Sequence, residues 1–155
     1  MIIAPCPGGA AELAEVMAVM TAAFDPAFGE AWSLPQVTGV LHGAGAALLV
    51  ARDGGPVLGF ALIRVVLDEA ELLLLAVDPA VRRQGTGARL VEAAAAVAGA
   101  RGATRLMLEV RDGNPAALLY QMAGFVPVGR RTGYYRRTAG APVDAITLSR
   151  PIPGA

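Results

Sequence analysis

The chain turns from strand to helix within residues 77–87, which read Val77-Asp78-Pro79-Ala80-Val81-Arg82-Arg83-Gln84-Gly85-Thr86-Gly87. Gly85 and Gly87 allow the backbone to come close to a ligand, and the free N–H groups of the first helical turn point towards it. The helix dipole favours negative charge at the same place, so the segment predicts an anion site that suits a diphosphate. Glycines before a helix are also common as plain turn residues, and the segment alone leaves that alternative open.

Hydrophobic periodicity on both sides of this segment predicts alternating helices and strands. Before it, the pattern predicts a first strand, a helix over 10–24 and a second, short helix with Ser33 as its N-cap. Three strands follow, over 46–51, 57–67 and 71–77. After it, the pattern gives a helix over 87–100, a strand over 105–110, a helix over 115–123 and strands near 125–130 and 145–148. The turn residues at 53–56 predict a hairpin between the second and third strands.

This order predicts one α+β (mixed α/β) domain over residues 1–155, with a parallel β-α-β crossover in its middle. The run 71–77 is apolar on both faces, which places it at the centre of the sheet. A chain of 155 residues is long enough for a core of its own. With 55% hydrophobic and 17% charged residues, general disorder is excluded.

The composition excludes many common catalytic chemistries. All 13 basic residues are arginine, which excludes Schiff-base chemistry and a P-loop lysine. The single cysteine, Cys6, and the single histidine, His42, cannot build a Cys/His zinc site, so no metal is expected. Thirteen acidic residues balance the basic ones, which gives no reason to expect nucleic-acid binding. Carboxylate, tyrosine and backbone chemistry remain.

The apolar runs are short. The most apolar stretches, over 72–77 and 93–100, fall well below the roughly 20 residues of a spanning helix. The first residues do not resemble a secretory signal, because they lack its basic region and its long apolar stretch. We therefore expect a soluble, cytoplasmic protein without a membrane partner.

The 77–87 segment is similar to the diphosphate loop of the GNAT family of acetyl-CoA-dependent N-acetyltransferases. That loop reads Q/R-x-x-G-x-G/A and matches Arg82, Gly85 and Gly87. Within the family the chain resembles the RimI-like enzymes, which acetylate the N-terminal alanine of a ribosomal protein. The other matching motifs, between about 24 and 148, are Phe28 with Trp32-Ser33, Glu69-Ala70-Glu71, Leu108-Glu109-Val110-Arg111, Asn114, Leu119-Tyr120, Gly124-Phe125, Gly129-Arg130-Arg131, Tyr134-Tyr135 and Asp144-Ala145.

The resemblance implies the GNAT fold, a mixed and mostly antiparallel sheet of about seven strands that splays between strands four and five and is flanked by about four helices. It implies acetyl-CoA as the acetyl donor and a protein or peptide N-terminus, such as that of a ribosomal protein, as the acceptor in a ternary complex. Two alternatives stay open. One is a GNAT enzyme that acetylates a small-molecule amine or a lysine side chain, and the other is a non-catalytic acyl-CoA-binding module.

The resemblance also places the coenzyme. Its pantetheine pairs with the backbone of Ala76 and Val77, and the Val77 N–H polarises the thioester carbonyl. Its diphosphate lies on the loop formed by Arg82, Arg83, Gln84, Gly85, Thr86 and Gly87. Asn114 touches the pantetheine, or only caps the following helix.

Two residues receive catalytic roles from the resemblance. Glu109, at the carboxyl end of its strand, is the general base for an α-ammonium whose pKa is about 7.7 to 8.0. The alternative is a surface pair with Arg111 or Arg105, and Glu71 on the neighbouring strand is the second candidate for the base. Tyr120 protonates the departing thiolate, or only packs in the core.

The acceptor site is expected to use Trp32, Glu71, Tyr134 and Tyr135. The two tyrosines follow Gly133, in the loop or hairpin before the last strand. Plain aromatic packing is the alternative for the tyrosines, and anchoring the second helix is the alternative for Trp32.

One spacing departs from the family. Asn114 and Tyr120 are six residues apart, whereas RimI-like sequences place them seven apart. We expect the turn at Asn114-Pro115 to absorb the missing residue, with the proline starting the helix. Tyr120 then keeps its position, and Asn114 is displaced.

Overall fold

The computed structural model describes residues 1–135 and 140–154. Its strands are β1 (Ile2–Cys6), β2 (Ala46–Arg52), β3 (Val57–Val66), β4 (Glu69–Val77), β5 (Arg105–Arg111), β6 (Val126–Tyr135) and β7 (Val143–Pro151). Its helices are α1 (Ala10–Ala23), α2 (Leu34–Leu41), α3 (Thr86–Ala100) and α4 (Ala117–Met122), with short 3-10 helices η1 (Pro26–Phe28) and η2 (Pro79–Val81).

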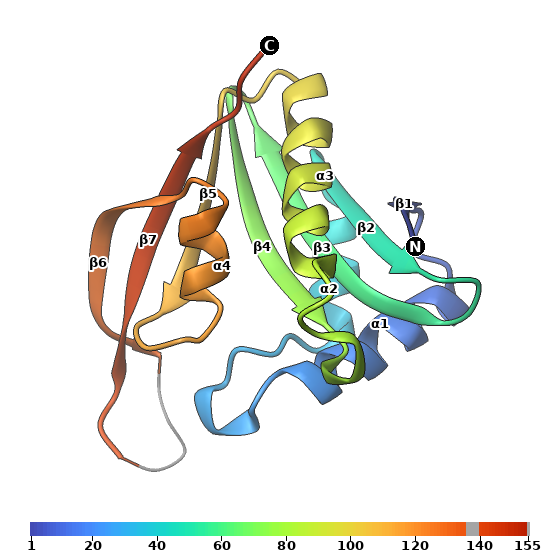
Figure 1. The fold of residues 1–155 in the computed structure, drawn as a ribbon, viewed down its shortest axis with the longest axis horizontal. Coiled ribbons are helices and arrows are strands. Elements are labelled where there is room, and N and C mark those ends of the chain that lie inside the picture. Colours follow the sequence, from blue (N-terminus) through green and yellow to red (C-terminus); the bar gives the residue numbers. More distant parts are fainter. Residues whose placement is uncertain (136–139, 155) are drawn as a thin grey trace.

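The seven strands form one sheet in the order β1-β2-β3-β4-β5-β7-β6, with β4 in the middle as predicted. The pair β4–β5 is parallel and its neighbours are antiparallel, because α3 carries the chain from the end of β4 back to the start of β5. Figure 1 shows α3 on one face of the sheet and α1 and α2 on the other. The predicted mixed, mostly antiparallel sheet is confirmed.

Two apolar clusters hold these layers together. One packs α3 and α4 against the sheet, with Leu90 and Leu106 fully enclosed. The other packs α1 and α2 against the opposite face, around Phe60 and Met20. Since β3 and β4 contribute to both clusters, the centre of the sheet is apolar on both sides.

Local signals explain most element boundaries. Ser33 accepts from the Gln36 N–H, and the Gln36 side chain accepts from the Ser33 N–H, which is a complete capping box for α2. The prediction for the helix after Asn114 was wrong at its start. Helix α4 begins at Ala117, and Pro115 lies in the preceding turn. The reason is that Asn114 already closes that turn with its own side chain and carbonyl group.

The strand near 125–130 is longer than predicted. Strand β6 continues to Tyr135, so Tyr134 and Tyr135 lie at the end of a strand, within the antiparallel β6–β7 hairpin before the last strand, and not in a loop. The reason is that β7 also begins earlier and pairs with this extension, with Tyr135 opposite Val143.

Candidate functional site

The central strands separate at their carboxyl ends. Strands β4 and β5 pair over three positions only, and the last pair joins Glu71 to Met107. Figure 1 shows the two strands diverging below this point. The predicted splay between strands four and five is therefore confirmed. Ala76 and Val77 lie in the part of β4 that β5 leaves unpaired.

A β-bulge in β4 lies at the start of the separated stretch. Leu72 pairs with Ile63 and Leu74 with Leu62, so Leu73 has no opposite residue in β3. The side chains of Leu73 and Leu74 consequently face the same cluster, on the side of α1 and α2. Bulges of this kind turn the backbone of a strand and are frequent beside binding sites.

Helix α3 begins beside this opening. Its N-cap, Gly85, has φ +80° and ψ 6°, a left-handed conformation that favours glycine. No side chain caps the helix, so the N–H groups of its first turn remain available to a ligand. Arg83 also has a positive φ of 64°, which places two left-handed residues in this short loop.

Two loop residues contact the neighbouring elements. A Cβ on Gly87 would lie 3.0 Å from Leu119 Cδ1, so the absence of a side chain there lets α4 pack against the start of α3. The Arg82 guanidinium donates to the carbonyl of Ala23 at the end of α1, 3.1 Å away. The exposed side chain of Arg82 is therefore engaged by α1, although its backbone stays in the loop.

Glu109 lies on the face of β5 opposite α3, with its side chain 21% exposed. Its Oε1 is 2.9 Å from the Nε of Arg131, which comes from β6. Arg105 and Arg111 were the alternative partners expected for Glu109. Each binds another residue, because Arg105 donates to Ser149 and Arg111 donates to Glu30. Sequence reasoning missed Arg131 as the partner, since the pairing of β6 with β7 and of β7 with β5 brings it there.

A hollow of about 540 Å³ opens beside Glu109. Its wall is formed by the turn between β3 and β4, by β5 and by Arg131. Glu71 lines the same hollow and its side chain is half exposed. Its Oε2 lies 3.6 Å from Nη2 of Arg64. The structure thus brings the two candidate bases to one surface.

Tyr120 is buried in α4 and meets the Phe125 ring edge-on, with 5.7 Å between the ring centres. Burial raises the pKa of its phenol far above the usual value, and the negative charge of Glu30 adds to the shift. The phenol therefore keeps its proton at all working pH values and can donate a hydrogen bond.

The rings of Tyr135 and Tyr134 lie edge-on to each other at the end of β6, with 5.1 Å between the ring centres. Burial, together with the charges of Glu30 and Glu109, raises the pKa of Tyr135 to about 12. Tyr134 is half exposed, and the Arg131 guanidinium lies 5.3 Å from its ring centre. The charge of Glu30 thus raises the pKa of both Tyr135 and Tyr120, and the charge of Glu109 acts on Tyr135 as well.

Trp32 lies elsewhere. It packs against the cluster of α1 and α2 and lines a second, shallow hollow on the surface of α2, about 350 Å³ in volume. Glu109 lines the other hollow, so the two side chains do not share one. Its position fits the alternative of an anchor for the second helix.

Asn114 is engaged by the protein itself. Its Oδ1 accepts from the Ala116 N–H at 2.9 Å, and its Nδ2 donates to Glu30 Oε2 at 3.2 Å. Glu30 is the second functional candidate that sequence reasoning missed, because no spacing signal connects it to residues more than 80 positions away.

The described residues contain no group of side chains that could hold a metal ion. Among these same residues, no helix combines the length and apolarity needed to cross a membrane.

Comparisons with known proteins agree with this geometry. Residues 15–125 match the acetyltransferase (GNAT) family. The [ribosomal protein bS18]-alanine N-acetyltransferase of Escherichia coli K12 is 44% identical over 101 residues, which cover 64% of this chain and 68% of that protein. The crystal structure of the ribosomal-protein-S18-alanine N-acetyltransferase from Escherichia coli has a TM-score of 0.83 and 34% identity, covering 99% of this chain and 96% of that one. An aminoglycoside 6'-N-acetyltransferase complexed with coenzyme A shares the fold, with a TM-score of 0.81 at 15% identity over 100% of this chain and 99% of that one.

Proposed function

Because this chain belongs to the GNAT family of acetyltransferases, we propose that it transfers the acetyl group of acetyl-CoA to the N-terminal amine of a protein. The observation that carries this proposal is the nearly full-length similarity to the Escherichia coli enzyme named for the alanine of ribosomal protein S18. The N-terminal alanine of that ribosomal protein is therefore the first acceptor to test.

The opening between β4 and β5 fits an extended, anionic coenzyme. Around Ala76 and Val77, β4 pairs with β3 on one side, and its other edge, which β5 leaves unpaired, is open to a strand-like pantetheine. The uncapped start of α3 offers N–H groups to a diphosphate, through Arg83, Gln84, Gly85, Thr86 and Gly87. Arg82 contributes through its backbone, because its side chain is bound to Ala23. Asn114 is displaced from the coenzyme, since Glu30 occupies its amide group.

The bound coenzyme supplies an acetyl thioester, and the residues around the opening supply the proton acceptor and the hydrogen-bond donors for its reaction. Glu109 accepts the proton that the acceptor ammonium must lose before its nitrogen attacks. The Val77 N–H donates to the carbonyl oxygen as negative charge develops there. The N–C bond forms, the C–S bond breaks, and Tyr120 donates a hydrogen bond to the departing sulfur. Because its pKa is raised, Tyr120 stabilises the thiolate with its proton retained.

The acceptor approaches from the hollow beside Glu109. Glu71 lines this hollow, and Tyr135 with Tyr134 stands at the end of β6 near Glu109. The side chain of Trp32 lines the separate hollow on α2, so the acceptor site that we propose beside Glu109 does not include that side chain.

The test is acetylation by the purified protein, followed by mass spectrometry. The acceptors are a peptide that begins with alanine, the same peptide with its N-terminus blocked and an internal lysine added, and a panel of small amines. We expect acetyl-CoA-dependent acetylation of the free N-terminal amine only. Modification of the lysine or of a small amine instead would reassign the acceptor. Coenzyme binding without turnover of any acceptor would indicate a non-catalytic module.

Tyr120→Phe should lower kcat by about tenfold or more, since it removes a hydrogen bond to a developing charge. The loss should be constant from pH 6 to 9, because the raised pKa keeps the native phenol protonated over that range. Initial rates at saturating substrates measure this effect, and thermal melting confirms the fold. Equal rates for Tyr120→Phe and wild type would remove Tyr120 from the mechanism.

A further inference from the structure

The segment between α1 and α2, residues 24–33, runs beneath the carboxyl ends of β4 and β5 (Figure 1). Little apolar packing holds its middle part in place. Helix η1 contains no buried residue, and Gly29 after it adopts a left-handed conformation with φ 62°. Phe24 and Trp32 pack the two ends of the segment against the cluster of α1 and α2, and polar contacts hold the part between them.

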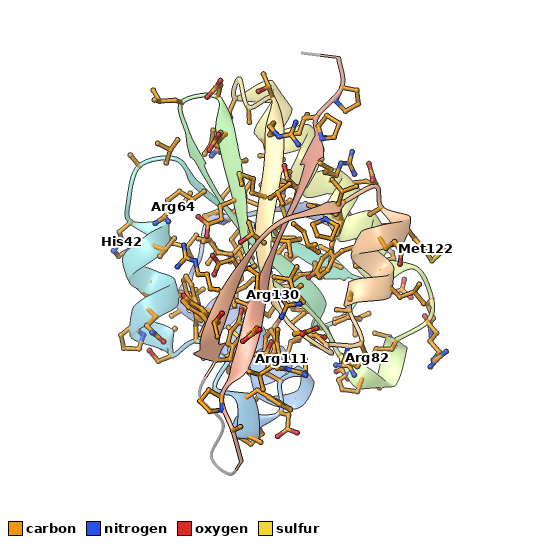
Figure 2. The ribbon with its side chains drawn as sticks, turned by 90° about the vertical axis from the view of Figure 1, so that its left-hand side faces the viewer. His42, Arg64, Arg82, Arg111, Met122 and Arg130 are labelled. Carbon is orange, nitrogen blue, oxygen red and sulfur yellow. The ribbon has the colours of Figure 1, made fainter. Side chains whose placement is uncertain are left out.

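Glu30 makes those contacts. Its Oε1 accepts from Arg111 Nε at 3.3 Å, and its Oε2 accepts from Asn114 Nδ2 at 3.2 Å. The side chains of Glu30 and Arg111 are only 12% and 13% exposed. The Arg111 guanidinium also lies 3.6 Å from the ring centre of Phe28, in the same segment. Figure 2 shows Arg111 at the lower end of the sheet, beside this segment. One partly buried carboxylate thus ties the segment to the end of β5 and to the turn before α4.

The same carboxylate lies near Glu109, because its partner Arg111 follows Glu109 by two positions on β5 and their side chains therefore lie on the same face of the sheet. The negative charge of Glu30 contributes to the raised pKa of Tyr120 and to that of Tyr135. The negative charge of Glu109 also raises the pKa of Tyr135. Glu30 therefore borders the space where the proposed base, the proposed hydrogen-bond donor and the acceptor wall meet. Both carboxylate oxygens of Glu30 already accept hydrogen bonds, one from Arg111 and one from Asn114. Glu30 therefore holds the segment in place and does not transfer a proton.

We propose that Glu30 is a positioning residue: through Arg111 and Asn114 it holds residues 24–33 as one side of the acceptor site and so sets the approach of the amine to Glu109. The inference rests on the proposed function. It predicts that loss of the Glu30 contacts weakens productive acceptor binding and leaves coenzyme binding intact.

Glu30→Gln tests this geometry. The new amide can still accept from Arg111, but its NH₂ group then faces the NH₂ group of Asn114, whose Oδ1 is already bonded to Ala116. We expect the KM of the alanine-starting peptide to rise about tenfold, because a buried hydrogen bond to a charged group is lost. The Kd of coenzyme A should change less than about twofold, since the loop at α3 is untouched.

A reciprocal exchange provides the rescue. In Glu30→Gln combined with Asn114→Asp, the new glutamine donates to the new aspartate and still accepts from Arg111, and the aspartate still accepts from the Ala116 N–H. The acceptor KM should return to within about threefold of wild type, because every bond of the network is restored. Asn114→Asp alone places two carboxylates together and should raise the KM. Glu92→Gln, which weakens the distant Arg150–Glu92 pair, is the matched control and should leave the KM unchanged.

Hydrogen–deuterium exchange measures the holding role without any acceptor. Residues 24–33 should exchange faster in Glu30→Gln and recover in the double variant. Wild-type exchange and wild-type KM in Glu30→Gln would overturn the proposal, as would a KM that the double variant fails to restore. A parallel loss of coenzyme affinity and of melting temperature would also overturn it, since that outcome indicates general destabilisation. If wild type acetylates no peptide, the proposed function fails, and the exchange data alone decide whether Glu30 holds the segment.

Discussion

Glu109→Gln is expected to lower kcat/KM for an alanine-starting peptide by about 10²- to 10⁴-fold, the usual effect of losing a general base. The loss should be largest below about pH 8, where the acceptor amine carries a proton that must be removed. Above that pH the free amine forms without help, so the difference from wild type should shrink. Rates measured from pH 6 to 9 give both the size and the direction of this dependence.

Two neighbouring carboxylates make this experiment specific. Glu69 lines the same hollow at the start of β4 and is exposed, so Glu69→Gln controls for the loss of one negative charge. Glu71→Gln tests the alternative base. A wild-type pH profile in Glu109→Gln, together with a large loss in Glu71→Gln, would transfer the base to Glu71. Coenzyme affinity should survive in all three variants, because none of them touches the start of α3.

Gly85→Glu is expected to weaken coenzyme A binding by about 100-fold. Two like charges about 4 Å apart repel by about 4 kcal/mol at an effective dielectric of about 20, and solvent screening reduces this value. The open space around Gly85 admits a side chain, since no atom lies within 4 Å of an added Cβ. The charge, and not a steric clash inside the protein, is therefore what the variant tests. Isothermal titration calorimetry with coenzyme A measures the effect.

Gly102→Glu is the matched control. Gly102 follows the other end of α3, also has a positive φ, and also has open space around an added Cβ. It thus reproduces the backbone strain and the added charge away from the diphosphate loop. Gly85→Ala separates strain from charge at the site itself. If Gly85→Glu binds coenzyme A as tightly as Gly102→Glu, the diphosphate does not lie on this loop.

The local elements of the fold were determined by the sequence alone, because their signals lie within a few residues of one another. Ser33 and Gln36 cap α2 through contacts three positions apart. The apolar run of β4 indicated its central position, because a strand in the middle of a covered sheet is buried on both faces. The parallel crossover followed from the order of elements, since a helix between two strands carries the chain back to the same edge. The family motifs then singled out Glu109, Tyr120 and the loop at 82–87 as candidates for the site.

Only the tertiary structure decided the partners of these residues. Any of 13 arginines can pair with a carboxylate, and charge gives no preference for Arg131 beside Glu109 or for Arg111 beside Glu30. The pairing of β6 with β7 and of β7 with β5 selects Arg131, and the course of residues 24–33 beneath the sheet selects Glu30. The same long-range packing binds Arg82 to Ala23 and keeps Trp32 on α2. Hydrophobic periodicity and capping act between near neighbours in the chain, whereas ion pairs depend on distances in space that arise only when the sheet closes.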